Sequence, residues 1–156
     1  MADNQVRNQL SFTEERLSWA LFEIRQFLNS VTLESLCSDG VEKASVEPLL
    51  DDIRHLFVYF DEGSDASRTI LKSGIFREAA AKKTMYWIFH KCVEAFFQPR
   101  LDGWYEDSRA AYSGKSSIRF RSVPPEQVRI LLIKIEGPIQ EIREELEYYE
   151  SGYSAR

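Results

Sequence analysis

The residues best suited to chemistry lie in one segment, from Trp104 to Arg121. Between Ser108 and Ser122 the segment contains no acidic residue, although the whole chain has a net charge of −5. It contains four cations: Arg109, Lys115, Arg119 and Arg121. Because alternate residues of a strand share a face, Arg119 and Arg121 could contact one phosphate or carboxylate. The sequence therefore predicts a candidate anion-binding site on these four residues.

Three aromatic residues accompany the cations, namely Trp104, Tyr105 and Tyr112. They could stack on a ligand or anchor the segment to the rest of the protein. Four cations on an acidic chain disfavour nucleic acid as the ligand, because affinity grows with the number of phosphates neutralised. The alternative is a solvated strand face whose arginines pair with the glutamate-rich end of the chain, residues 141–150.

The run from Ser113 to Ser117 looks like the end of a phosphate-binding P-loop. The full motif needs a glycine at position 109, where this chain has arginine. It also needs a following helix, and Pro124-Pro125 comes too soon for one. We therefore interpret the run as a turn with an exposed lysine.

Two adjacent carboxylates, Glu106 and Asp107, could perform acid–base chemistry beside Tyr105 and Arg109. Adjacent residues rarely face one site, so capping or pairing with Arg109 is the favoured role. Neither a Glu-x-x-His pair nor a G-x-S-x-G motif occurs in the sequence. We therefore predict no catalytic residue, no metal site and no cofactor.

The two histidines and two cysteines give no further site. His55 and His90 lie on separate predicted helices and are interpreted as hydrogen-bonded side chains on helix flanks. Cys37 and Cys92 lie in apolar helical surroundings, far apart in sequence, and are predicted to be reduced.

Amphipathic helices must position this segment. Ser11 and Glu14 form a capping box that predicts a helix start, followed by an apolar seam. Thr32 is predicted to cap a short second helix. Ser45 is predicted to cap the third helix, and Gly63 to end that helix. Residues 66–72 are predicted to form a short helix, and residues 75–97 the most apolar helix. The first seam consists of Leu17, Leu21, Ile24, Leu28 and Val31.

A heptad seam defines the last helix and continues past Gly137-Pro138, which predicts a kinked helix there and not a loop. Its members are Val128, Leu132, Ile135, Ile139, Ile142, Leu146, Tyr149 and Tyr153. Before it, Ile118 and Phe120 alternate with arginines, which predicts a strand. Residues 110–112 are its predicted partner, and Gly114 lies in the turn. The predicted fold is mainly α: a four- to five-helix bundle with a short β-hairpin inserted before the last long helix.

A chain of 156 residues has the length of one domain. We expect a single helical domain over residues 1–156, with the hairpin insert at about 104–122. The first residues lack the basic and apolar regions of a signal peptide, and no apolar run reaches the length of a membrane span. These features predict a cytoplasmic protein without membrane contact.

Two sequence stretches carry a family resemblance. The run from Trp104 to Gly114 and the run from Ile142 to Glu150 resemble the YpuI-like family of small uncharacterised proteins from Gram-positive bacilli, and residues 76–80 fit the same family. The resemblance covers most of the chain. It implies a cytoplasmic bacterial protein of about this length, and it brings no activity, cofactor or catalytic residue.

Three functional hypotheses follow from the sequence. The first is a noncatalytic interaction or structural protein, with a protein partner or a homodimer through the last helix. The second is a binder of an anionic ligand or nucleic acid through the basic hairpin. The third is an enzyme with a cleft between hairpin and bundle, using Tyr105, Glu106, Asp107 and Arg109.

Overall fold

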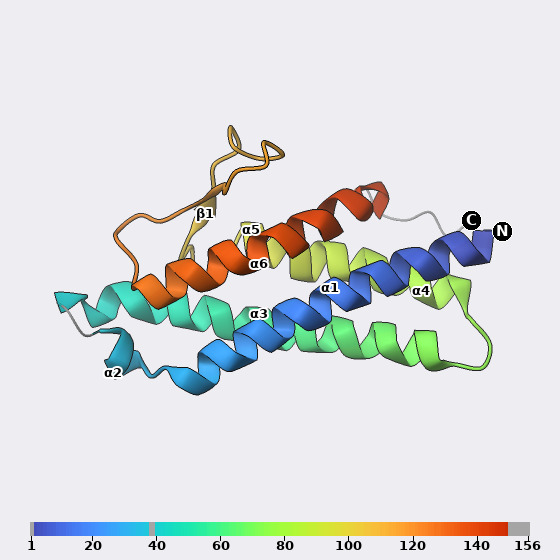
Figure 1. Ribbon diagram of the computed structural model, residues 1–156, viewed down its shortest axis with the longest axis horizontal. Coiled ribbons are helices and arrows are strands. Elements are labelled where there is room, and N and C mark those ends of the chain that lie inside the picture. Colours follow the sequence, from blue (N-terminus) through green and yellow to red (C-terminus); the bar gives the residue numbers. More distant parts are fainter. Residues whose placement is uncertain (1, 38–39, 150–156) are drawn as a thin grey trace.

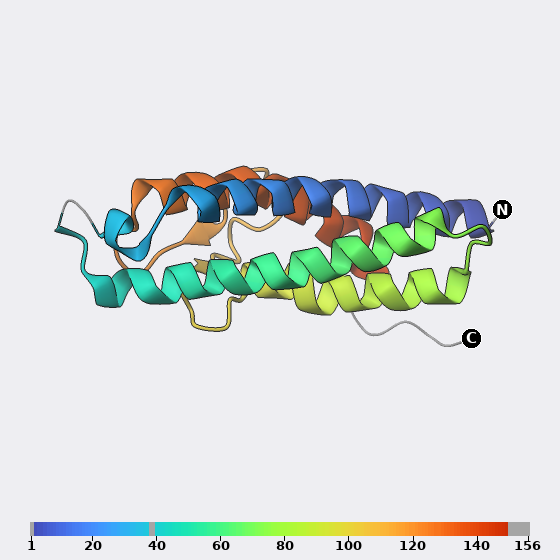
Figure 2. The ribbon, with the colours of Figure 1, turned by 90° about the horizontal axis from the view of Figure 1, so that it is seen from below.

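The computed structural model describes residues 2–37 and 40–149. Four long helical stretches form an elongated bundle of two layers (Figures 1 and 2). One layer holds α1 (Ala2–Ser30) and α6 (Glu126–Glu145), and the other holds α3 (Lys43–Lys72) and the stretch from α4 (Glu78–Ile88) to α5 (Glu94–Phe97). The mainly α fold is confirmed.

Shorter elements connect and complete the bundle. The helix α2 (Leu33–Leu36) follows α1, and the predicted cap at Thr32 is confirmed; Thr32 and Ser35 also form a capping box. The π-helical turn η2 (Phe89–Val93) joins α4 to α5, and the 3-10 turn η3 (Glu147–Tyr149) follows α6. Strands β1 (Tyr105–Glu106) and β2 (Ile118–Arg119) pair antiparallel before α6.

Two predicted helix starts were wrong. The helix α1 begins at Ala2 and passes through Ser11, because Val6 and Leu10 extend its buried seam toward the N-terminus. The helix α3 begins at Lys43, and Glu42 precedes it without a side-chain cap, so Ser45 lies inside the helix. In α1 the apolar stripe, and not the nearest serine, sets the helix start, whereas the first buried residue of α3 is Val46, after the helix has begun.

Gly63 does not end a helix, and residues 66–72 belong to α3. A Cβ at Gly63 would lie 2.8 Å from Leu17 Cδ2 and 3.2 Å from Ile88 Cγ1. The glycine therefore lets α3 approach both α1 and α4 closely. A glycine selected for helix packing gives the same sequence signal as a glycine that ends a helix.

The last helix follows its prediction. Every seam residue from Val128 to Tyr149 is buried, and α6 continues through Pro138. Tyr153 lies outside the described residues. Both Cys37 and Cys92 are free thiols, and Cys92 is fully buried in the core. Among the described residues, none of the helices is both long and apolar enough to cross a membrane.

The hairpin is present, but its first strand was misplaced. Tyr105 pairs with Arg119 and Glu106 with Ile118, so residues 107–117 form a long loop between the strands. Gly114 lies in this loop with φ +82°, and Tyr112 has φ +62°. The left-handed backbone at Tyr112 is incompatible with the predicted strand over 110–112. The hairpin stands out from one side of the bundle (Figure 1).

Candidate functional site

The hairpin segment is attached to the bundle at its beginning by Trp104. This side chain is completely buried, and its Nε1 donates a hydrogen bond of 2.6 Å to the carbonyl oxygen of Phe96. Its ring also lies 6.4 Å from the Phe96 ring. A buried indole whose N–H is satisfied fixes the chain where it leaves α5.

Asp52 of α3 holds the turn before Trp104. Its Oδ1 accepts from the Leu101 amide and its Oδ2 from the Gly103 amide, both at 2.9 Å. A Cβ at Gly103 would lie 2.9 Å from Asp52 Oδ2, so the approach needs glycine. Burial raises the pKa of Asp52, and the two amide hydrogen bonds oppose that rise.

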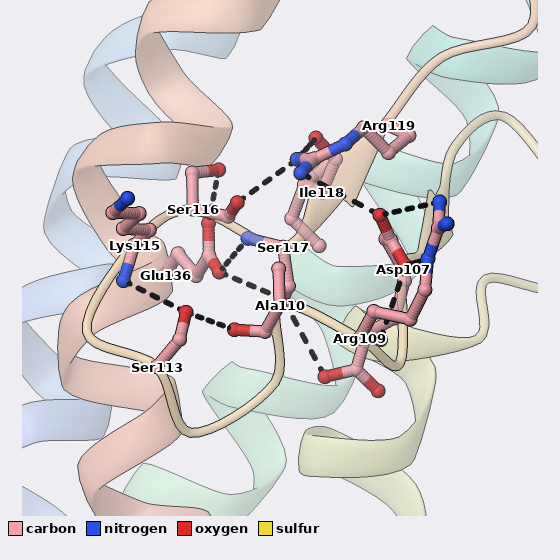
Figure 3. A network of polar contacts seen from close by, with 11 residues as sticks. Asp107, Arg109, Ala110, Ser113, Lys115, Ser116, Ser117, Ile118, Arg119 and Glu136 are labelled. Atoms are coloured by element: carbon pink, nitrogen blue, oxygen red, sulfur yellow. Dashed lines mark hydrogen bonds and ion pairs between the residues drawn. The ribbon is translucent and has the colours of Figure 1, made fainter.

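Glu136 of α6 holds the C-terminal end of the long loop, at Ser116 and Ser117 (Figure 3). Its Oε1 accepts from Ser116 Oγ at 2.7 Å. Its Oε2 accepts from the Ser117 amide at 2.8 Å and from Ser117 Oγ at 3.0 Å. The residue is buried, and neutral donors alone contact its carboxylate among the described residues.

A third contact joins β1 to α6. Arg143 donates from Nη1 to Glu106 Oε1 at 3.1 Å and from Nη2 to Glu106 Oε2 at 2.6 Å. The guanidinium lies between two rings, 3.6 Å from the Phe97 centroid and 4.8 Å from the Tyr112 centroid. A two-point pair that is mostly buried fixes both orientation and distance. The last helix therefore supplies a cation here, and the hairpin supplies the acid.

Two of the four predicted anion-binding cations contact Asp107. Arg109 Nε lies 3.2 Å and Arg119 Nη2 3.7 Å from its carboxylate oxygens (Figure 3). Arg109 holds the pKa of Asp107 below its usual value, chiefly through the side-chain hydrogen bond. Arg119 Nη1 also donates to the carbonyl oxygens of Ser116 at 2.9 Å and Ile118 at 3.1 Å. Arg119 thus satisfies backbone groups beside β2.

The other two cations have different surroundings. Arg121 donates to the carbonyl oxygen of Asp102 at 3.2 Å and lies 5.0 Å from the Tyr105 ring centroid. Lys115 borders a cavity, and its amide donates to Ser113 Oγ at 3.3 Å. The structure therefore does not bring the four cations to one point. The alternative pairing of the arginines with glutamates of the last helix is not seen for Arg109 and Arg119, which contact Asp107 among the described residues.

The predicted aromatic residues are divided between interior and surface. Trp104 is buried, whereas Tyr105 and Tyr112 are exposed. Tyr112 Oη donates to Glu147 Oε1 at 3.4 Å, and partial burial raises the pKa of its phenol. Tyr112 thus covers Arg143 and contacts the end of α6, while Tyr105 supports Arg121.

Several hollows border the hairpin, and two of them share Ser116 and Ile133 in their lining. A cavity of about 430 Å³ lies between the long loop and α6. A groove of about 520 Å³ lies where β2 and the following chain approach α6. The cavity is lined by Tyr112, Gly114, Lys115, Ser116, Ser117, Ile133, Glu136, Gly137, Gln140 and Glu144. The groove is lined by Ser116, Ile118, Arg119, Phe120, Arg121, Ser122, Val123, Pro124, Arg129 and Ile133.

The histidines lie away from these hollows. His90 has Nδ1 at 2.9 Å from Glu94 Oε1 and Nε2 at 3.1 Å from the carbonyl oxygen of Tyr149. His55 stacks loosely on Tyr59. In the part of the chain that the structure describes, no group of three or more His, Cys, Asp or Glu side chains is arranged to hold a metal ion.

Comparison with known proteins agrees with the resemblance of the two sequence runs. Residues 10–155 match the model of a protein family of unknown function, DUF3907. The chain is also 37% identical to the uncharacterized protein YpuI of Bacillus subtilis (strain 168), over 99% of this chain and 87% of the relative. The chain belongs to this family. No solved structure matches it.

Sequence reasoning missed Asp52, Glu136 and Arg143, which make the attachments described above. Each had a signal. Asp52 and Glu136 are charged residues within buried apolar stripes, next to Ile53 and Ile135. Arg143 is the one cation in the acidic run 141–147. A charge at a core position is informative because it needs a specific partner.

Proposed function

We propose that this member of the family is a noncatalytic interaction protein of the bacterial cytoplasm, in which the bundle presents the hairpin and the exposed side of α6 to a protein partner. The observation that carries the proposal is that acidic side chains at the hairpin–bundle junction are paired with other residues of the protein. Glu106 pairs with Arg143, Asp107 with Arg109 and Arg119, and Glu136 with two serines. General acids and bases must instead be able to exchange protons with a substrate.

Exposed apolar side chains beside the hairpin support the proposal. Val123 is 86% exposed, and Ile130 and Ile133 of α6 are 52% and 42% exposed. These three residues form what we call the α6 apolar face. Exposed aliphatic groups near one another are typical of protein-binding surfaces. The long loop and β2 border this face, so the hairpin would form one wall of the interface.

Photocrosslinking tests this function. A benzoylphenylalanine residue replaces Ile133, and the variant is expressed in the cells that normally make the protein. The matched control carries the same residue at Val58 of α3, which is 50% exposed. We expect a discrete adduct from position 133 and none from position 58. No adduct at position 133, or the same adducts from both positions, would contradict the proposed function.

The size of the same adduct separates the two kinds of partner. A mass equal to two copies of this chain identifies a homodimer, and any other discrete mass identifies a different protein. Both are interactions at this face, and the second is the one we expect.

A second candidate, an enzyme with its cleft at the hairpin–bundle junction, is favoured by one observation. The cavity of about 430 Å³ has the size of a small-molecule site and has the buried carboxylate Glu136 in its lining. A metabolite that is consumed by the intact protein and not by Glu136→Gln would favour this candidate over the first.

A further inference from the structure

The groove beside β2 differs in charge from the rest of the protein. Three arginines line it, Arg119, Arg121 and Arg129, and none of the acidic residues that the structure describes does. The whole chain, in contrast, has 25 acidic and 20 basic residues. A local positive region on a negative protein selects for partners of the opposite charge.

The floor of the groove is aliphatic. Ile118 is buried there, and Ile133 and Val123 are exposed along its length. Pro124 and Phe120 complete the apolar lining. A ligand of charge alone would leave this apolar surface in water, whereas a segment with both carboxylates and aliphatic side chains would cover it.

Two of the arginines can contact a ligand with only a small loss of free energy from their present contacts. Arg129 pairs with Glu126 one helical turn away, and both side chains are largely exposed. Exposed pairs of this kind contribute little to stability and exchange readily. Arg121 contacts a carbonyl oxygen and a ring, and forms no ion pair with a described residue. Arg119 is less available, because it already contacts Asp107 and two carbonyl oxygens.

The position of Arg119 also restricts how a partner binds. Its guanidinium occupies the carbonyl oxygens of Ser116 and Ile118. Those two carbonyl oxygens are therefore already hydrogen-bonded and less available to an added strand. A partner in this groove would be recognised through its side chains.

We propose that the groove between β2 and α6 binds an acidic segment with aliphatic side chains from a different protein. The inference rests on the proposed function and names the chemistry of its partner. Nucleic acid fits less well, because the lining has one aromatic residue for stacking and few cations for phosphates. A second copy fits less well too. In a dimer the acidic end of α6 of each copy would have to occupy the groove of the other, and a crosslinked mass of two copies from position 133 would identify that arrangement and overturn the choice of a different protein.

Three short fluorescein-labelled peptides test the proposal, in which leucine alternates with aspartate, serine or lysine. Fluorescence anisotropy measures their binding to the intact chain. We expect the aspartate peptide to bind on the order of tenfold more tightly than the serine peptide, with the difference reduced by salt. The double variant Arg121→Glu, Arg129→Glu should lose this preference and favour the lysine peptide.

A matched control keeps the charge change and moves it elsewhere. Arg54 forms an exposed pair with Asp51 one turn away, as Arg129 does with Glu126, and Arg109 lies in the same hairpin outside the groove lining. Arg54→Glu, Arg109→Glu should retain the aspartate preference. Circular dichroism confirms that each variant is folded, and Arg121→Gln serves if the glutamate variant is not.

Equal binding of the three peptides, or an aspartate preference that survives the Arg121 and Arg129 reversals, would overturn the inference. A single-stranded oligonucleotide of equal charge that displaces the aspartate peptide at lower concentration would overturn it as well. The crosslinking test distinguishes the two claims. An adduct at position 133 that persists in the double arginine variant leaves the proposed function standing and removes the acidic partner, whereas no adduct removes both.

Discussion

Two buried carboxylates from two helices attach the hairpin segment at two points, the turn before Trp104 and the end of the long loop, and they do so differently. Asp52 accepts from two backbone amides, those of Leu101 and Gly103. Glu136 accepts from one amide and two serine hydroxyls. The Asp52 contact is packed against Leu49, whereas the Glu136 contact borders an open cavity. A buried carboxylate thus gives a rigid attachment through backbone amides before Trp104. At the end of the long loop, which faces candidate partners, a second buried carboxylate gives an attachment that depends on serine side chains.

The largest expected effect comes from removing the Asp52 carboxylate. Asp52→Ala leaves two amides without acceptors in a packed site, so we expect a loss of about 3 kcal/mol in the free energy of unfolding. Urea denaturation measures it. The neighbouring Asp51, which is exposed and pairs with Arg54, provides the control, and Asp51→Ala should change stability by no more than about 0.5 kcal/mol. Equal effects of the two changes would contradict the role of Asp52.

Glu136→Ala should destabilise the protein less, by about 1 to 2 kcal/mol, because the released serine groups can reach water in the adjoining cavity. The position of the effect is more informative than its size. Hydrogen exchange followed by mass spectrometry should show faster exchange in residues 113–117 and unchanged exchange in residues 101–103. Faster exchange at both ends would mean that the two attachments are not independent.

The serine hydroxyls distinguish the two contacts further. Ser117→Ala removes a buried donor to Glu136 and should cost about 1 kcal/mol. Ser122→Ala, at an exposed position after β2, should be neutral within the error of the urea measurement. If Ser117→Ala is also neutral, the Ser117 hydroxyl contributes nothing measurable, and the attachment rests on the Ser117 amide and the Ser116 hydroxyl.

The smallest expected effect is a pH dependence with opposite signs at two aspartates. Burial raises the pKa of Asp52 above 3.8, so the folded state binds its proton more readily than the unfolded state does. The free energy of unfolding should therefore fall as pH rises from 3.8 through the raised pKa, relative to Asp52→Asn. Arg109 lowers the pKa of Asp107, so its contribution is present above 3.8 and is lost as pH falls through the lowered pKa.

Acid titrations of urea stability for the intact chain, Asp52→Asn and Asp107→Asn check these signs. If the free energy of unfolding of the intact chain rises with pH relative to that of Asp52→Asn, the buried state of that carboxylate is contradicted.

The sequence predicted the helices well where burial alone decides them. The α6 seam from Val128 to Tyr149 is such a case, since a heptad pattern survives even a proline. The sequence prediction failed where the same residue pattern occurs in two different structural situations. Gly63 was predicted to end a helix, and the structure uses it for close packing against Leu17. Ser11 and Glu14 have the spacing of a capping box, yet α1 runs through both residues.

The candidate site was predictable in its location and not in its contacts. The alternation of Ile118 and Arg119 predicted β2, but nothing local marked Tyr105–Glu106 as its partner. The pairing of Glu106 with Arg143 joins residues 37 positions apart. Such a contact depends on how α6 packs beside the hairpin, which no local pattern specifies. Charges in apolar stripes, such as Glu136, were the available clue.

The central claim is that the bundle presents the hairpin and the α6 apolar face to a partner. It is tested most directly by the crosslinking yield from position 133 in the intact chain and in Glu136→Ala, with both chains judged folded by circular dichroism. The account predicts a discrete adduct in the intact chain and a marked loss in Glu136→Ala, because Glu136 holds the loop that borders the face. An absent adduct, or an equal yield from both chains, would contradict the account.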